Sequence, residues 1–290
     1  MPTRFHRCDG CLETPNPSTE GCMHLKRWIT GLAVLPVLIY FVWAGGWVLG
    51  AFVAAAGLVA LWEYYRIVFS VSGQPVFSPI PLVGFILCPL VIGAACMGSV
   101  AAVLAFVVFD LILATVAGLR RHRPDPTVVD TMAKQALGFV YIPVFLAHVI
   151  LLRGTPDGIA WIFFFLIIVF ANDIGALYAG LTLGRHKLCP AVSPGKTIEG
   201  SVGGMAAGFA VGAVYKLLLF PGLPWGASLG FFLCVGMAGP VGDLFESMLK
   251  RSGQIKDSGV LLPGHGGLLD RIDALLFAAP VAYYYRMIIF

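Results

Sequence analysis

Long stretches with few or no charged residues alternate along the chain with short polar segments. The first stretch, residues 28–62, is divided by Gly45 and Gly46, which predicts a hairpin of two short apolar helices. Because a bilayer span needs about 20 mainly apolar residues, we assign further spans to residues 81–97, 99–119, 135–152, 159–173, 202–219, 227–243 and 274–290. The pattern predicts an all-α, polytopic membrane protein with about nine transmembrane helices.

Composition leaves little room for anything outside the membrane. Hydrophobic residues make up 59% of the 290 and charged residues 12%, whereas soluble domains carry roughly 25% charged residues. The mean hydropathy is +0.89. We expect a cytoplasmic, disordered tail over residues 1–23 and a single transmembrane domain over residues 24–290, with its functional site drawn mainly from residues 172–200 and 243–273.

Basic residues fix the expected orientation, because loops that face the cytoplasm hold most Lys and Arg. With nine spans and a cytoplasmic N-terminus, all of the 19 Lys and Arg except Arg153, Lys216 and Arg286 fall on the inner side. A span fewer or more before the polar segments would destroy this asymmetry. The polar segments are therefore predicted to face the cytosol.

The N-terminal tail has two interpretations. Cys8, Cys11, Cys22 and His24 are spaced as C-x2-C-x10-C-x-H, and such ligands suit a tetrahedral zinc site. Alternatively, residues 1–22 are a disordered extension, with Met23 as a second possible start. The tail lacks the apolar core of a signal peptide, and the seven cysteines imply no disulfide framework.

The most strongly charged segment runs from residue 243 to residue 273. Asp243, Glu246, Ser247 and Lys250 follow one another at i, i+3, i+4 and i+7, so they share one helical face. Two further acids open the last helix, at positions 270 and 273. Carboxylates from neighbouring helix ends can converge on a hard cation such as Mg²⁺. The alternative is an ordinary solvated loop with weak salt bridges.

Glycines interrupt this segment on both sides of His265. Glycine permits close approach of the main chain to a ligand, and successive N–H groups in such turns bind anions. Gly266 and Gly267 are therefore candidates to cradle a phosphate. His265 could donate a hydrogen bond or a proton, although a lone histidine in a loop is equally consistent with a structural role.

A second polar segment follows the sixth span, which itself carries Asp173. The run from Gly195 is not a Walker A loop, because Pro190 stands where that motif needs glycine. Phosphate binding remains plausible chemistry, since the segment offers cations, hydroxyl donors and an orienting acid: Arg185, Lys196, Ser193, Thr197 and Glu199. The competing interpretation is a basic juxtamembrane loop attracted to anionic lipid.

These residues form a signature that resembles one known family, the phosphatidate cytidylyltransferases or CDP-diacylglycerol synthases. The signature reads Ser247-x-Leu249-Lys250-Arg251-x4-Lys256-Asp257-x-Gly259-x2-Leu262-Pro263-x-His265-Gly266-Gly267-Leu268-x-Asp270-Arg271-Ile272-Asp273. The segments 193–200 and 27–32 are similar to further family motifs, so the resemblance covers residues 24–290. Leu177 and Ile198 depart from residues common in the family, which affects the expected shape of the nucleotide pocket.

The resemblance implies transfer of CMP from CTP to phosphatidate, giving CDP-diacylglycerol and pyrophosphate, at the cytoplasmic face of a bacterial plasma membrane. It implies Mg²⁺, with room for a second metal ion, on Asp243, Asp270, Asp273 and Glu246. It assigns catalysis to Lys250, Arg251, Asp257 and His265. Substrate binding falls to Asp173, Ser193, Lys196, Thr197, Glu199, Ser247, Lys256, Gly266, Gly267 and Arg271.

Two other functions remain open at this point. A CTP-dependent polyprenol kinase resembles the family distantly and would transfer the γ-phosphate instead. A transporter would use the charges within apolar segments, but we find no pair of corresponding discontinuous repeats and interpret Asp110 and His148 as hydrogen-bonding groups between helices. Beyond its substrates, the expected partner is the lipid bilayer, with no nucleic acid. The many small residues permit a homodimer and a monomer equally.

Overall fold

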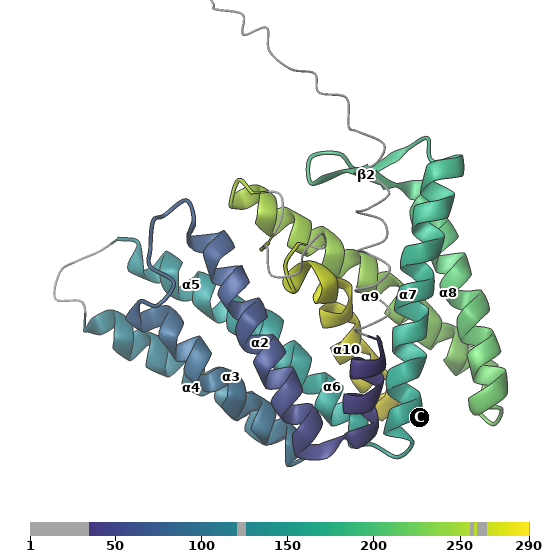
Figure 1. Cartoon of the computed structure of the whole chain (residues 1–290), viewed down its shortest axis with the longest axis horizontal. Coiled ribbons are helices and arrows are strands. Elements are labelled where there is room, and N and C mark those ends of the chain that lie inside the picture. The colour runs from purple at the N-terminus through teal and green to yellow at the C-terminus, as the bar shows by residue number, and fades with distance from the viewer. Residues whose placement is uncertain (1–34, 121–125, 256–257, 260–265, 290) are drawn as a thin grey trace, which may run out of the picture.

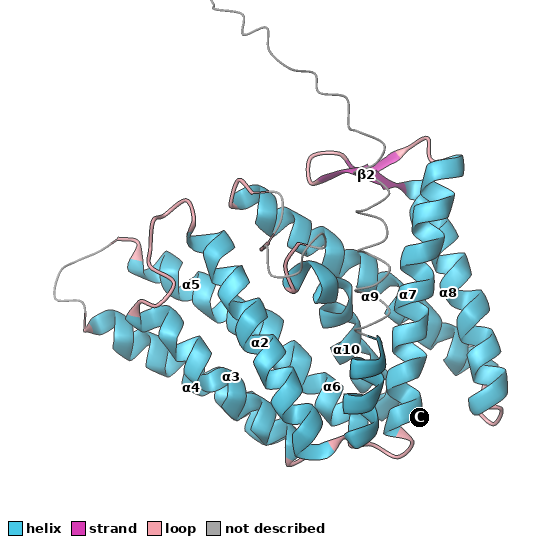
Figure 2. Ribbon diagram, in the orientation of Figure 1, coloured by secondary structure: helices cyan, strands magenta, loops and turns pink. Residues whose placement is uncertain are grey.

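A computed structural model describes residues 35–120, 126–255, 258–259 and 266–289. A short apolar helix, Leu35–Ala44, comes first. The elements that follow are α2 (Gly46–Phe69), α3 (Pro79–Cys96), α4 (Val100–Leu119), α5 (Val128–Phe139), the π-helical turn η1 (Val140–Val144), α6 (Phe145–Arg153), α7 (Gly158–Leu183), β1 (Lys187–Cys189), β2 (Ser193–Thr197), α8 (Ile198–Leu219), α9 (Trp225–Ser252) and α10 (Leu269–Ile289). Figure 2 shows helices throughout, apart from the small hairpin of β1 and β2.

Eight of the described helical stretches are long and apolar enough to cross a membrane, counting α5, η1 and α6 as one. The prediction of an all-α, polytopic membrane protein is confirmed. The count of nine stays a prediction, because the first expected span begins among residues outside the described ones and continues as Leu35–Ala44. The helix is interrupted at Gly45 and Gly46 as expected, and both glycines have a positive φ.

Several helix boundaries differ from the sequence-based expectation: α2 continues to Phe69, α7 continues to Leu183 and α10 begins at Leu269. The fifth span begins at Val128 rather than near residue 135, because its first turns are amphipathic and look like a loop by hydropathy alone. Helix α9 continues nine residues beyond Asp243 to Ser252, so the charged residues of that face lie on regular helix. The antiparallel β1–β2 hairpin was not predicted, since its strands are only three and five residues long.

The helices form one bundle with two distinct edges (Figure 1). The pair α3 and α4 lies at one edge, the pair α7 and α8 at the other, and α9 and α10 lie between them. Helix α8 buries a row of glycines at every fourth position against α7: Gly200, Gly204, Gly208 and Gly212. Small residues of this kind let membrane helices approach closely. The row holds α8, and with it the hairpin, close to α7.

Helices α9 and α10 also pack closely, next to the acidic residues. A Cβ at Gly242 would collide with the carbonyl oxygen of Asp273, so only glycine allows this approach. Asn172 of α7 donates a hydrogen bond of 2.7 Å to the carbonyl of Gly236 on α9. These two contacts bring acidic positions of α7, α9 and α10 to the same level of the bundle.

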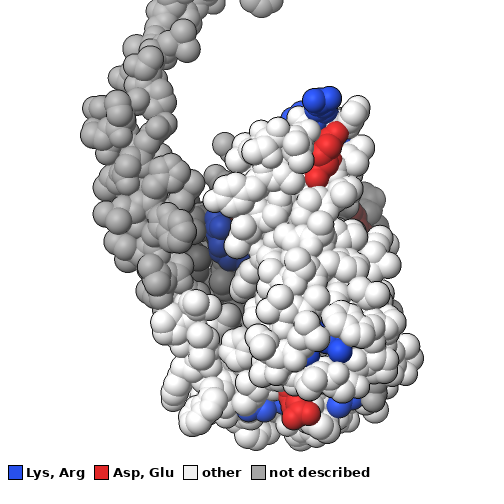
Figure 3. Space-filling model, turned by 90° about the vertical axis from the view of Figure 1, so that its right-hand side faces the viewer, with Lys and Arg blue, Asp and Glu red and all other residues white. Residues whose placement is uncertain are grey.

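The end of the molecule that carries β1 and β2, here called the hairpin end, holds most of the described basic residues. They are Arg66, Arg120, Lys134, Arg185, Lys187, Lys196, Lys250, Arg251 and Arg271. The face shown in Figure 3 is mostly uncharged at its centre; charged side chains lie toward the top and bottom and, in one blue group, at the left edge near mid-height. This distribution is the one expected of a protein with lipid around its middle.

The three basic residues at the opposite end each have a specific partner. Arg153 donates hydrogen bonds to the carbonyls of Val42 and Trp43, at 2.8 and 3.2 Å. Two others lie over aromatic rings: Lys216 over Trp225 and Arg286 over Trp161. Carbonyl and ring contacts compensate the charge of these cations locally. This explains why they lie at the end of the molecule opposite to most other Lys and Arg residues.

Two polar residues inside the apolar segments have structural partners. Gln135 of α5 donates a hydrogen bond of 2.6 Å to Asp110 of α4, which confirms the interpretation of Asp110 as a link between helices. For His148 the interpretation needs correction: its Nδ1 lies 2.8 Å from the carbonyl of Val144 in its own helical segment. Its contact with α10 is through the rings of Tyr283 and Tyr284.

Candidate active site

An ion cluster joins α9 to α10 near the hairpin end. Lys250 contacts the carboxylate of Glu246, one turn earlier on α9, and Glu246 is fully buried. The same ammonium group donates a hydrogen bond of 2.8 Å to Oδ1 of Asp270. Glu246 and Lys250 therefore share one face of α9, as their spacing predicted. The Lys250 ammonium group contacts two carboxyl groups at once.

The second oxygen of Asp270 organises the chain before α10. It accepts hydrogen bonds from the backbone N–H of Gly267 at 2.8 Å, the hydroxyl of Ser258 at 2.9 Å and the N–H of Ser258 at 3.2 Å. Both oxygens of this carboxylate are thus engaged by the protein. Asp270 fixes the conformation of the chain at the start of α10 as well as the position of Lys250.

A second acidic group lies beside this cluster, with one carboxylate from each of three helices. Asp173 of α7, Asp243 of α9 and Asp273 of α10 all lie within electrostatic range of one another. Lys196 of β2 forms an ion pair of 2.5 Å with Asp243. Since Asp173 precedes the end of α7 by ten residues, it lies about 15 Å from that end at the usual helical rise. The acidic group therefore lies within the length of the spanning helices.

The hairpin that carries Lys196 is tied to α8 by polar contacts. Glu199, in the first turn of α8, accepts hydrogen bonds from the backbone N–H groups of Arg185 and His186, both at 3.1 Å. Its other oxygen lies 2.6 Å from the His186 ring. Thr197 caps α8 by accepting a hydrogen bond of 3.0 Å from Gly200. Glu199 and Thr197, both expected to bind substrate, thus hold the hairpin in place.

Helix α9 holds the other side of the hairpin. Arg251 donates a hydrogen bond of 3.2 Å from Nε to the carbonyl of Val192, in the turn between β1 and β2. Together with the contacts at the start of α8, this bond fixes Lys196 over the acidic group. Of three further predicted substrate-binding residues, Ser193 on β2 and Ser247 on α9 are half-buried, and Arg271 on α10 is exposed.

The glycines before α10 allow the backbone there to lie close to other parts of the protein. A Cβ at Gly267 would collide with the Ser258 hydroxyl and with Glu63 of α2, and Gly266 has a positive φ of 77°. Since the Gly267 N–H already donates to Asp270, its proposed role with phosphate stays a prediction. Three other predicted site residues, Lys256, Asp257 and His265, lie outside the described residues.

Glu63 is a site residue that sequence reasoning missed. It is fully buried on α2 and accepts hydrogen bonds from the N–H groups of Leu268 and Leu269 and from the Ser258 hydroxyl. It follows directly on the uncharged stretch 28–62, where a charge looks like the end of a span. The helix instead continues to Phe69, and that continuation of apolar residues is the signal that could have placed Glu63 inside it.

The acidic residues differ in how well they suit a metal ion. In the described part of the chain, no group of three or more His, Cys, Asp or Glu side chains is arranged to hold a metal ion as it stands. The donor chemistry of Asp173, Asp243 and Asp273 nevertheless fits Mg²⁺, which prefers carboxylate oxygens, and Asp243 already holds one cationic group, that of Lys196. Glu246 and Asp270 instead hold Lys250.

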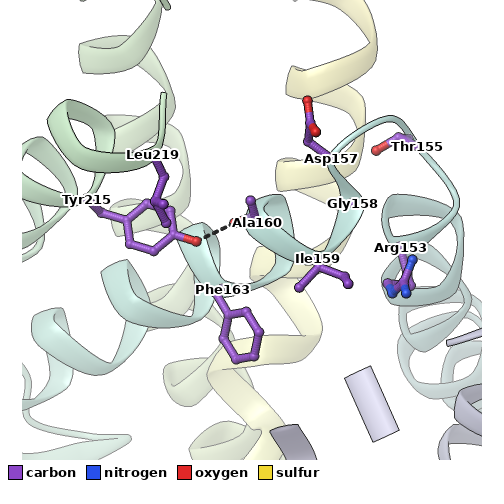
Figure 4. Close-up of a pocket in the computed structure, with 9 residues that line it drawn as sticks. All are labelled: Arg153, Thr155, Asp157, Gly158, Ile159, Ala160, Phe163, Tyr215 and Leu219. Carbon is purple, nitrogen blue, oxygen red and sulfur yellow. Dashed lines mark hydrogen bonds between the residues drawn. The ribbon is translucent and has the colours of Figure 1, made fainter. Parts of the chain in front are cut away.

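A separate cavity of about 460 Å³ opens at the other end of the bundle (Figure 4). It is lined by the α6–α7 connection and by α8, and the Tyr215 hydroxyl there donates a hydrogen bond of 2.9 Å to the carbonyl of Ala160. Its charged lining residues are Arg153 and Asp157. None of the predicted site residues lines it, so we place the functional site at the hairpin end.

Comparison with known proteins bears on the same region. Residues 25–289 match the model of the family described as "Cytidylyltransferase family". The chain belongs to the cytidylyltransferase family. This range agrees with the resemblance over residues 24–290 noted in the sequence, and it includes both acidic groups and the hairpin.

Relatives in this family carry the name phosphatidate cytidylyltransferase. The protein of Brucella suis biovar 1 (strain 1330) is 33% identical over 264 residues, which cover 90% of this chain and 93% of the relative. That of Bacillus subtilis (strain 168) is 36% identical over 156 residues, covering 53% of this chain and 58% of the relative. For Mycobacterium tuberculosis (strain ATCC 25618 / H37Rv) the identity is 39% over 145 residues, covering 50% of this chain and 44% of the relative.

Proposed function

We propose that this protein transfers CMP from CTP to phosphatidate and releases CDP-diacylglycerol and pyrophosphate. The observation that carries the proposal is the position of two lysine–carboxylate pairs, Lys196 with Asp243 and Lys250 with Asp270, at the hairpin end of the spanning helices. A lipid head group can reach that level from within the bilayer. The names of the family relatives, one of them aligned over 90% of this chain, support the same reaction.

The reaction needs positioning more than proton transfer. A phosphate monoester has a second pKa of about 6, so at neutral pH the lipid phosphate is already an anionic nucleophile. The bond that forms joins its oxygen to the α-phosphorus of CTP, and the bond that breaks joins that phosphorus to the oxygen leading to the β-phosphate. The leaving pyrophosphate takes the electron pair. Catalysis then rests on holding two mutually repelling anions in line.

The described cations have separate duties in this scheme. Lys196 comes from the hairpin and Lys250 from α9, so the two ammonium groups approach the acids from different elements. We assign both to phosphate oxygens of the substrates, with Arg251 beside the hairpin turn. The loss of hydrogen bonds to the acids on substrate binding is compensated by stronger charge-assisted bonds to phosphate.

Asp173, Asp243 and Asp273 are the residues that would hold Mg²⁺. Bound there, the ion would neutralise phosphate charge and orient the triphosphate. Glu246 and Asp270, which we also expected to bind metal, would act mainly by positioning Lys250. A second metal ion and a homodimer stay predictions.

We further propose that the hairpin end faces the cytoplasm, because most described basic residues lie there and loops rich in Lys and Arg stay inside. Cys189 of β1 tests this orientation in right-side-out vesicles. In a variant that keeps only this cysteine, a membrane-impermeant maleimide should leave it unlabelled until the vesicles are opened. Labelling of intact vesicles would reverse the proposed orientation.

Position-specific labelling of CTP tests the reaction. Purified protein is incubated with detergent-dispersed phosphatidate, Mg²⁺ and CTP carrying ³²P on either the α- or the γ-phosphate. We expect α-label in the lipid and γ-label in pyrophosphate. Lipid carrying γ-label, with α-label left in soluble CDP, would show a kinase instead.

A further inference from the structure

Tyr141 lies in the one described turn of the spanning helices that departs from α-helical geometry. The π-helical turn η1, Val140–Val144, contains Pro143 between α5 and α6. Proline has no N–H to donate and its ring crowds the preceding turn, which accounts for a local change of helical geometry. Single π-turns inside α-helices occur frequently at functional sites. Here the turn redirects the side chains of one spanning helix toward α9 and α10.

The ring of Tyr141 is clamped at the level of the acidic residues. Its centroid lies 4.9 Å from that of Phe245 on α9 and 5.8 Å from that of Phe277 on α10. Phe245 stands between Asp243 and Glu246 in the sequence, and Phe277 follows Asp273 by one helical turn. These edge-on and tilted aromatic contacts fix the ring orientation and hence the direction of its hydroxyl.

Among the described residues, the hydroxyl of Tyr141 has no hydrogen-bond partner. The residue is 2% exposed, and its oxygen makes no hydrogen bond among the residues that the structure describes. It is within electrostatic range of Asp273, Glu246 and Asp243. A buried hydroxyl without a partner destabilises the fold, so its presence beside three carboxylates calls for an acceptor that arrives with a ligand.

The neighbouring tyrosine shows the contrast. Tyr64 of α2 packs edge-on against Tyr141, with ring centroids 6.3 Å apart, and is also buried. Its hydroxyl, however, donates a hydrogen bond of 3.0 Å to the carbonyl of Lys134. The two neighbouring, similarly buried tyrosines therefore differ: among the described residues, the Tyr64 hydroxyl has an acceptor and the Tyr141 hydroxyl has none.

We infer that the Tyr141 hydroxyl is a further substrate-binding group, which donates a hydrogen bond to a phosphate oxygen bound beside Asp243 and Asp273. The inference rests on the proposed function for the identity of the anion, which is either the triphosphate of CTP or the phosphate of phosphatidate. Both present the same charged acceptor. Because a phosphate oxygen accepts hydrogen bonds, the hydroxyl acts as the donor, and Tyr141 complements Lys196 and Lys250 from the side of α5 and α6.

Tyr141→Phe removes this donor without removing any hydrogen bond of the described fold, and Tyr64→Phe serves as the matched control. We expect Y141F to keep or slightly raise the melting temperature in detergent and to lower kcat/KM by roughly ten- to a hundred-fold, the factor for a lost hydrogen bond to a charged group. Y64F should lower the melting temperature and leave kcat/KM of the folded protein near that of the wild type.

Separate titrations identify the acceptor. A raised KM for CTP, with weaker CTP binding by calorimetry, assigns the hydroxyl to the nucleotide, and a raised KM for phosphatidate alone assigns it to the lipid. Equal kcat/KM and equal CTP binding in Y141F and wild type would overturn the inference, as would a loss of activity that follows a lowered melting temperature. If the wild type binds CTP without transferring CMP, the proposed function fails, and the affinities of Y141F for CTP and for phosphatidate still decide the role of the hydroxyl.

Discussion

The carboxylate of Glu63, on α2, accepts a hydrogen bond of 2.8 Å from the backbone N–H of Leu269, the first residue of α10. A second bond, of 3.0 Å, comes from the N–H of Leu268. Free N–H groups at a helix N-terminus attract negative charge, so Glu63 acts as a cap supplied from a distant helix. It thereby fixes the start of the helix that carries Asp270 and Asp273.

We expect Glu63→Ala to lower the free energy of unfolding by about 1–3 kcal/mol, the cost of leaving buried hydrogen-bonding groups unpaired. Activity should fall with it, because the start of α10 loses its anchor. Glu63→Gln keeps one acceptor oxygen and should retain part of both. Thermal unfolding in detergent and CMP transfer measure the two effects.

Asp130→Ala is the control for Glu63, since Asp130 pairs with Lys134 on the exposed start of α5. Exposed ion pairs contribute about 0–1 kcal/mol. If E63A proves no more destabilising than D130A, Glu63 does not cap α10 as the structure indicates.

Removing the charge of Lys250 should be costly, because Glu246 is fully buried beside it. Breaking a buried pair from one side costs about 3–5 kcal/mol, so we expect Lys250→Met to unfold at a much lower temperature and to be inactive. Adding Glu246→Gln should restore much of the stability and none of the activity.

This double variant separates the two roles of Lys250, structural and chemical. Recovery of turnover in K250M/E246Q would mean that the ammonium group serves only to neutralise Glu246. An unchanged melting temperature in K250M would contradict the ion pair itself.

The acidic group of Asp173, Asp243 and Asp273 predicts a requirement for divalent metal. A chelator should abolish CMP transfer, and Mg²⁺ should restore it. Asp243→Asn should be inactive at every Mg²⁺ concentration while the protein still inserts in the membrane, whereas Asp173→Asn should raise the Mg²⁺ concentration needed for half-maximal rate. Full activity of the wild type in excess chelator would rule out this use of the carboxylates.

Gly267→Ala tests the close approach before α10. The added methyl group would meet the Ser258 hydroxyl and the Glu63 carboxylate, so we expect a lower melting temperature and a loss of activity. Gly195→Ala, in the hairpin, is the matched control, because a Cβ there meets no atom within 4 Å. Similar behaviour of the two variants would contradict the packing described around Glu63.

The sequence predicted those features that depend on near neighbours in the chain. Apolar stretches set the spans, and helical spacing placed Glu246 and Lys250 on one face, where they form an ion pair. The sequence analysis grouped Asp243 with Asp273 as metal ligands and assigned Asp173 to substrate binding. That Asp173 lies beside the other two could not be predicted, because it depends on how α7 packs against α9 and α10.

Other features of the site were not predicted from the sequence, for physical reasons of the same kind. Glu63 acts on residues about 205 positions later in the chain, a distance over which periodicity carries no information. Tyr141 looks like an ordinary apolar-span residue until the π-turn and the neighbouring rings show the direction of its hydroxyl. The short hairpin strands lie below the length at which alternation can be recognised.

Asp173 and Asp243 lie well inside the spanning helices, while Lys196 reaches Asp243 from a hairpin outside them. In such an arrangement, a water-soluble substrate approaches along the membrane normal, and a lipid substrate approaches laterally within one leaflet. In the proposed reaction, the two substrates meet at the carboxylates. Entry of the nucleotide and release of the lipid product therefore need not use the same opening.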